Sequence, residues 1–223
     1  PPRSTPKPSS AASDVYKRQG YGDVFTSVLG AQIVLVVIFT LLFFALCFVN
    51  LTVADRLAPT DRPPGPEEEL VARYHQFIGN RAWLVRLLVS VVLALLAGFG
   101  VSDRWQEWLL FTNGGDFGIS DAQFNRDVGF YVFRLPFFGF IVGWLFGALI
   151  VILVVTTIFH YVNGGIRLQT VGERVRPAVK AHLSVILGLL AAVKAFDYWL
   201  AKFELTTSTR GAVNGATLSL IHI

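Results

Sequence analysis

Residues 136–162 form an apolar run that contains no Asp, Glu, Lys or Arg. About 20 apolar residues in a helix cross the hydrocarbon core of a bilayer, so this run is long enough to span it with some tilt. A soluble domain does not bury so long an uncharged helix by itself. The run therefore predicts a membrane-spanning helix, and the rest of the chain must be compatible with a bilayer.

Small residues recur at every fourth position in two of the apolar runs. The first series is Gly139, Gly143 and Gly147, and the second is Ser184, Gly188 and Ala192. A spacing of four places each series on one helix face, where the backbone of a neighbouring helix can approach closely. We expect these two spans to pack face to face through the two series. Ala94 and Gly98 form a weaker face of the same kind.

The composition supports an integral membrane protein. Hydrophobic residues make up 53% of the chain and charged residues 15%, with a formal net charge of +4. The basic residues flank the apolar runs and form no patch suited to nucleic acid, so the expected partner is the lipid bilayer. The single cysteine, Cys47, lies inside an apolar run and is expected to be a small buried residue.

Four apolar runs predict an all-α membrane protein with four transmembrane helices and interfacial helices or loops between them. The spans are expected at residues 28–49, 82–101, 136–162 and 181–201, within a polytopic region at 20–205. The proline-rich connection before the second span carries an apolar stripe at 70–78, which predicts a short amphipathic helix on the membrane surface. A soluble helix packed on other loops is an equal alternative.

The connection at 102–135 is crowded with aromatic and turn-forming residues, which predicts a loop folded down onto the membrane interface. Lys and Arg are more frequent in the loops at 50–81 and 163–180 than in this one. By the positive-inside rule, those two loops are expected in the cytoplasm. Loop 102–135 and the tail at 206–223 are then expected outside the plasma membrane.

The two ends look foreign to the fold. Residues 1–19 are rich in Pro, Ser, Lys and Arg without a pattern, as in a disordered tail or an artefactual one. Residues 14–19 and 218–223 both resemble translated sequencing-adapter sequence. Because methionine is absent even at position 1, we expect a fragment of a longer protein.

Lys194 and Asp197 are ionisable residues within the fourth predicted span. At a spacing of three they can share one face of a helix and neutralise each other. Because charges inside a bilayer are costly, such residues often mark a pathway. We expect a structural ion pair here, with an ion or proton pathway as the alternative.

Other polar groups predict no reactive site. His160 and His182 lie at the two ends of one loop, and we expect ordinary hydrogen bonds, because a shared metal would need further ligands. The oxygen-bearing residues Asp116, Asp121, Asn125 and Asp127 do not have EF-hand spacing, which favours a capped turn over a calcium site. No nucleophile is placed beside a base, so we expect no enzyme, no catalytic residue, no metal and no cofactor.

Several longer motifs resemble a known family. They are the segments 105–111 (WQEWLLF), 117–124 (FGISDAQF), 127–137 (DVGFYVFRLPF), 160–167 (HYVNGGIR), 181–184 (AHLS) and 194–200 (KAFDYWL). Together they resemble Uncharacterised Protein Family 0182 (UPF0182), large bacterial membrane proteins common in actinobacteria. The resemblance implies about seven spans and a large extracytoplasmic domain, of which this chain would hold the second to fifth spans. It implies no activity, and Asp197 departs from the small or apolar residue of the family pattern.

Two functions remain open from the sequence. A membrane anchor or scaffold for an extracytoplasmic domain, with envelope proteins as partners, predicts tightly packed apolar spans. A transporter or channel subunit predicts polar residues that converge at mid-membrane. The span centres near Val36, Leu93, Leu149 and Leu189 are apolar, which favours the scaffold.

Overall fold

The computed structural model describes residues 22–59, 81–167 and 174–207, and within these ranges the secondary structure consists of helices joined by turns and loops. The main helices are α2 (Gly22–Arg56), α4 (Ala82–Phe99), α5 (Trp105–Asn113), α6 (Leu135–Val162) and α7 (Pro177–Glu204). Short turns of helix are η2 (Ser102–Arg104), η3 (Phe130–Arg134) and η4 (Leu205–Thr207). The described residues form no strand, only isolated bridges between Ser120 and Asp127 and between Ile166 and Val175. The all-helical prediction is confirmed for this part of the chain.

Four helical segments among the described residues are long and apolar enough to cross a membrane. They are Gly22–Arg56, Ala82–Asn113, Phe130–Val162 and Pro177–Glu204. Each predicted span falls within one of them. The first is longer than its predicted span, because no Pro interrupts residues 22–56 and helical propensity extends beyond the apolar core of the run.

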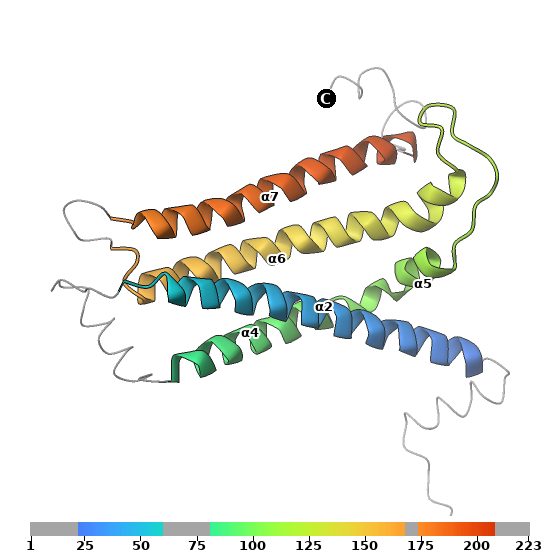
Figure 1. Ribbon diagram of the computed structural model, residues 1–223. Helices are drawn as coiled ribbons and strands as arrows, with labels where there is room; N and C mark the ends of the chain where they lie inside the picture. The colour runs from blue at the N-terminus through green and yellow to red at the C-terminus, as the bar shows by residue number, and fades with distance from the viewer. Residues whose placement is uncertain (1–21, 60–80, 168–173, 208–223) are drawn as a thin grey trace, which may run out of the picture.

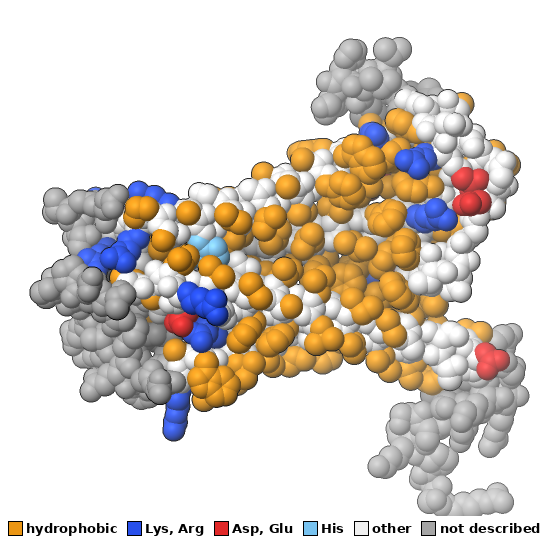
Figure 2. Space-filling model, viewed as in Figure 1, with side chains coloured by type: hydrophobic (Ala, Val, Ile, Leu, Met, Phe, Trp, Pro, Cys, Tyr) orange, Lys and Arg blue, Asp and Glu red, His pale blue; other side chains and the backbone are white. Residues whose placement is uncertain are grey.

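The four long helices lie side by side, and helices that follow one another along the chain run in opposite directions, so the bundle has two distinct ends (Figure 1). We call the end where α2 and α6 finish and α4 and α7 begin the basic end. Figure 2 shows Lys and Arg side chains gathered there. The opposite end carries α5, η3 and the loop at 114–129, and we call it the aromatic end. Between the two ends the visible surface is almost entirely hydrophobic.

Helix α2 packs mainly on α4, α6 packs mainly on α7, and the contact between α2 and α6 joins the two pairs. One core cluster joins Phe43, Cys47 and Leu51 of α2 to Ala94 of α4 and Ile152 of α6. The buried residues of α4 are Ser90, Ala94 and Gly98, which repeat every fourth residue. The weaker small-residue face predicted at Ala94 and Gly98 is thus the one on which α2 packs.

The prediction of a loop over the whole of 102–135 is wrong in its first half. Residues 105–113 form helix α5, because no Gly or Pro interrupts them before Gly114 and because their aromatic side chains pack against a buried cluster. Trp105, Trp108 and Phe111 pack against a cluster formed by α2 and α6. The later part does fold back onto the helices, where the ring centroid of Phe124 lies 5.1 Å from that of Phe203.

Three predictions fall on residues that the structure does not describe. The amphipathic helix expected near 70–78 lies outside the described ranges, as do the N-terminal tail and most of the C-terminal one. These expectations stay predictions.

Candidate functional site

The small-residue series of α6 and α7 do not meet. Gly143, Gly147, Ser184, Gly188 and Ala192 are all exposed, and Gly139 is only partly buried. A Cβ added at Gly143, Gly147 or Gly188 would have no heavy atom within 4 Å, and one at Gly139 would meet only Glu204 Oε1 at 3.5 Å. The prediction that these six residues form the seam between α6 and α7 is therefore wrong for the described chain.

Larger side chains form that seam instead. Val142 of α6 and Leu200 and Phe203 of α7 belong to one buried cluster, with Phe138 and Val193 packed against it. Gly143 directly follows Val142, so it points about 100° away around a helix of 3.6 residues per turn. The spacing of four correctly places the glycines on one face. It does not specify which face a neighbouring helix covers, and branched and aromatic side chains bury more surface against α7.

Lys194 and Asp197 form the predicted ion pair. Lys194 Nζ lies 2.7 Å from Asp197 Oδ2, and the two side chains are 45% and 40% exposed. The ammonium group also lies 5.0 Å from the ring centroid of Tyr198 and 5.7 Å from that of Phe146 on α6. The half-exposed pair thus lies beside α6, on a different face of α7 from the exposed Gly188 and Ala192.

Three helices meet through a chain of hydrogen bonds near the basic end. His160 Nε2 of α6 lies 3.0 Å from His182 Nδ1 of α7, and His182 Nε2 lies 3.2 Å from Asn50 Oδ1 of α2. His160 is fully buried. The expectation of ordinary hydrogen bonds at the two histidines is confirmed, and Asn50 is a partner that the sequence did not indicate.

The hydrogen bonds define which nitrogen of each ring carries a proton. Asn50 Nδ2 donates to Leu46 O at 2.7 Å, so Asn50 Oδ1 is the acceptor toward His182. His182 must then donate from Nε2, and its Nδ1 accepts from His160 Nε2–H. For neutral rings, the donors therefore run in one direction, from His160 through His182 to Asn50 and Leu46.

This chain of hydrogen bonds leaves His160 Nδ1 as a buried nitrogen without a hydrogen-bond partner among the described residues. Thr156 Oγ1 and Asn163 Nδ2 are also buried without partners there. These residues occupy positions i, i+4 and i+7, so they share one face of α6. Because unpaired buried polar atoms are costly, this face is the best candidate for a functional site.

A turn closes over His160. The Gly165 amide donates to His160 O at 2.8 Å. A Cβ at Gly165 would lie 2.9 Å from Val179 Cγ2 and 3.7 Å from His160 Nδ1. A Cβ at position 165 would therefore force Val179 or the turn to shift, whereas its distance from His160 Nδ1 is an ordinary van der Waals contact.

A second polar link near the basic end joins α2 to α4. Arg86 Nη1 forms an ion pair with Asp55 Oδ2, and Arg86 is the more buried partner, with 13% of its side chain exposed against 37% for Asp55. An arginine such as Arg86, near the end of a span, can reach back to the lipid headgroups. It pairs with Asp55 instead, because the antiparallel helices place the two residues at the same level. The sequence did contain a signal for this pair. Asp55 lies at the end of one span and Arg86 near the start of the next, and two antiparallel helices bring such positions together.

Two carboxylates stabilise the loop at the aromatic end. Asp127 accepts hydrogen bonds from the amides of Phe117, Gly118 and Gly129 at 2.9, 2.8 and 2.6 Å. Asp121 accepts from the Phe124 amide at 2.8 Å. The bonds from Phe117 and Gly129 hold the pKa of Asp127 below its ordinary value, and the Phe124 bond does the same for the pKa of Asp121. The expected capped turn is confirmed, since these carboxylate oxygens accept hydrogen bonds from backbone amides of the loop.

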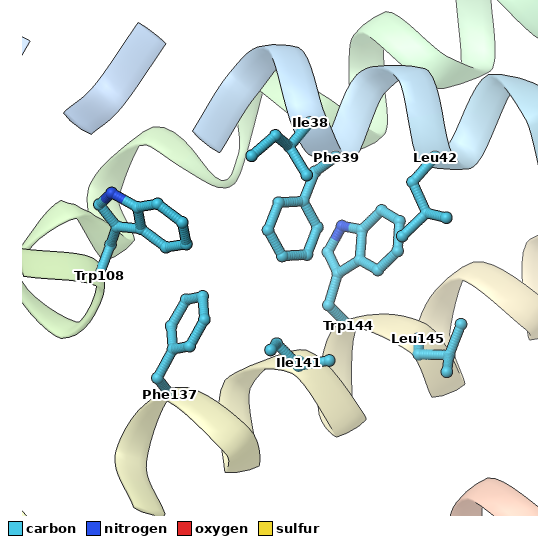
Figure 3. Close-up of a pocket in the computed structure, with 8 residues that line it drawn as sticks. All are labelled: Ile38, Phe39, Leu42, Trp108, Phe137, Ile141, Trp144 and Leu145. Atoms are coloured by element: carbon cyan, nitrogen blue, oxygen red, sulfur yellow. The ribbon is translucent and has the colours of Figure 1, made fainter. Parts of the chain in front are cut away.

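An apolar hollow of about 220 Å³ lies between α2, α5 and α6 (Figure 3). Phe39 and Trp144 form its centre, with their ring centroids 4.7 Å apart and nearly perpendicular. The Trp144 indole donates to Ala97 O of α4 at 3.3 Å, so the ring ties α6 to a third helix. The lining is entirely apolar, which suits packing and offers nothing to polarise a substrate.

Within the described ranges, no group of three or more His, Cys, Asp or Glu residues is placed to hold a metal ion.

The comparison with known proteins is decisive for the family. The sequence profile of an uncharacterised protein family, UPF0182, matches residues 12–223. The chain belongs to the UPF0182 family.

Related UPF0182 proteins come from actinobacteria. A UPF0182 protein of Frankia casuarinae is 42% identical over 207 residues, which is 93% of this chain and 20% of that protein. One of Nocardioides is 38% identical over 208 residues, and one of Streptomyces coelicolor is 36% identical over 195. This UPF0182 chain spans about a fifth of the length of the curated relatives it matches. No solved structure matches it.

Proposed function

We propose that this UPF0182 chain is part of a multi-pass protein of the bacterial plasma membrane, where its helices act as an anchor or scaffold for an extracytoplasmic domain. The observation that supports a scaffold is the apolar packing between the helices. The core clusters consist of Phe, Leu, Val, Ile, Ala, Trp, Tyr and Cys side chains. Close packing of this kind suits a rigid support, and it leaves little room for a hydrated route.

The proposed orientation follows the charge of the two ends. The basic end would lie in the cytoplasm, because Lys and Arg favour that side. The aromatic end would then lie at the outer interface, where Trp and Tyr side chains are favoured. In this orientation the loop capped by Asp121 and Asp127 faces the extracytoplasmic domain.

Further spans of a longer polypeptide are the proposed partners of α7. The half-exposed Lys194–Asp197 pair lies on this helix, and charges in a membrane span almost always face other protein or a water-filled cavity. The exposed Gly188 and Ala192 would let another helix approach closely. The curated relatives are about five times as long as the stretch they share with this chain, which gives room for such spans. Envelope proteins would be additional partners of the outer domain.

A transporter or channel subunit is the second candidate. The observation that favours it is the buried histidine chain at the basic end, since buried polar groups that link several helices often mark ion pathways. Catalysis is not part of either proposal.

A flux measurement separates the two functions. The full-length protein would be reconstituted in liposomes, and ion and solute flux would be compared between the wild type, Lys194→Ala and the matched exposed control Ala192→Ser. The scaffold proposal expects the same low flux in all three. Flux that requires Lys194 but tolerates Ala192→Ser would overturn it in favour of a transporter.

A further inference from the structure

His160 Nδ1 is the open end of the hydrogen-bond chain. The direction of these hydrogen bonds leaves Nδ1 with a lone pair that can accept a hydrogen bond, and no described residue donates one to it. An imidazole nitrogen in this state is basic and binds a proton when one is supplied. When a proton binds there, no other bond of the chain has to change, because His160 Nε2–H still donates to His182 Nδ1.

Among the described residues, the surroundings of the ring offer the added charge no counterion. In the described part of the chain, Gly165 lies next to Nδ1 and Val179 packs against Gly165, and we call these two residues the cover. On α2, the carboxylate closest in sequence to Asn50 is that of Asp55, and it is already paired with Arg86. Helix α6 contributes no Asp or Glu, and the segment after it is basic. The other described charged or titratable side chains that these elements and their connections carry toward the basic end are Cys47, Arg56, Arg81, Tyr161, Arg167, Arg174, Arg176 and Lys180.

We propose that His160 and His182 together bind one proton near the basic end of the bundle, and that this proton loosens α7 from α6 and α2. The proton adds to His160 Nδ1, and the two rings share the resulting charge through the hydrogen bond between them. A buried imidazolium without a carboxylate is strongly disfavoured unless water reaches it. The least costly opening is the cover itself, the Gly165 turn and the first turns of α7.

The neighbouring unpaired atoms fit this site. Thr156 Oγ1 and Asn163 Nδ2 lie on the same face of α6 as His160, and each is buried without a partner among the described residues. Once the cover opens, water that enters would accept a hydrogen bond from the new Nδ1–H group and satisfy these atoms as well. The closed and open forms therefore differ in how many polar groups are satisfied, which gives a two-state element that a proton can bias.

The protonation states of the two rings provide the first test. In a His75→Gln, His222→Gln background, His160 and His182 are the only imidazoles of the 223-residue sequence. Nitrogen-15 NMR of the membrane-embedded chain at about pH 8, above the ordinary imidazole pKa of about 6.5, should show both rings protonated at Nε2 only. Acidification should add one proton for the pair, at an Nδ1 position. Two rings that titrate independently as exposed imidazoles would overturn the proposal.

The second test measures the opening. In a Cys47→Ala background, spin labels at the exposed positions Ile158 of α6 and Val185 of α7 report the separation of the helices near the pair. Acidification should shift the distance to longer values in the wild type, and His160→Gln should abolish the shift. Lys180→Gln, an exposed change on α7 two residues from His182, should keep it.

Either of two results would contradict the coupling. One is an acid-induced shift that persists in His160→Gln. The other is an unchanged distance in protein whose rings have taken up the proton by NMR. Because the NMR measurement retains both histidines, the proposal stays testable even if His160→Gln fails to fold.

Discussion

Thr40 of α2 lies directly on Gly98 of α4, so that a Cβ built at position 98 would come within 1.8 Å of the Thr40 hydroxyl oxygen. This is the closest approach between helices at any described glycine, and it lies in the interface between α2 and α4. We expect Gly98→Ala to destabilise the bundle by about 1–3 kcal/mol, the usual cost of overpacking a core. Reversible unfolding in mixed micelles would measure the change.

Gly143→Ala is the matched control for that prediction. It adds the same methyl group to a helix glycine with no heavy atom within 4 Å of the new Cβ. Its effect should be neutral or stabilising, by up to about 1 kcal/mol, because alanine favours a helix more than glycine does. Equal destabilisation by the two substitutions would show that α2 and α4 do not approach as described.

The ion pair between Asp55 and Arg86 gives a prediction about the basic end. Asp55→Asn should destabilise the bundle by about 1–3 kcal/mol, because it leaves a largely buried guanidinium without its charged partner. The double variant Asp55→Leu, Arg86→Leu should be less destabilised than the single one, since it removes both charges together. A double-mutant cycle on unfolding free energies, closed with the single variants Asp55→Leu and Arg86→Leu, tests this. Additive effects would mean that the two side chains do not interact.

The loop at the aromatic end should depend on the ionised form of Asp127. Three backbone amides donate to this carboxylate, and its pKa is lowered as a result. A lowered folded-state pKa means that the stabilisation is complete above the unfolded value of about 3.9 and is lost as the pH falls through the folded value. Asp127→Asn should therefore mimic acid.

Hydrogen exchange at the amides of Phe117, Gly118 and Gly129 reports this loop. Asp127→Asn should speed their exchange at neutral pH, and the loop of the variant should respond less to acid than that of the wild type. Asp116→Asn is the control, because Asp116 is 67% exposed and lies 3.6 Å from Arg134 without contacting these amides. Unchanged exchange in Asp127→Asn would refute the capping role.

The sequence predicted the helices well and their contacts less well, for physical reasons that particular residues illustrate. Long, mostly apolar runs define membrane-length helices locally, so the four spans follow from composition. Which faces meet depends on the rotation of each helix, which spacing alone does not specify. Gly143 and Gly98 carry the same local signal, yet only Gly98 has a partner helix over it. The Lys194–Asp197 pair was predictable because it lies within one helix, whereas Asn50 and His182 are 132 residues apart.

The open small-residue face of α7 yields a prediction that separates this chain from a longer protein. Gly188→Leu should change the unfolding free energy of the 223-residue chain by no more than about 0.5 kcal/mol, because nothing lies within 4 Å of a Cβ there. If further spans cover this face, the same substitution in the full-length protein would force two helices apart and lower its stability by about 1–3 kcal/mol. Unfolding of both proteins, each with and without Gly188→Leu, gives the comparison. An equally small effect in the full-length protein would mean that α7 faces lipid at this position, and the proposed packing of further spans on it would be wrong.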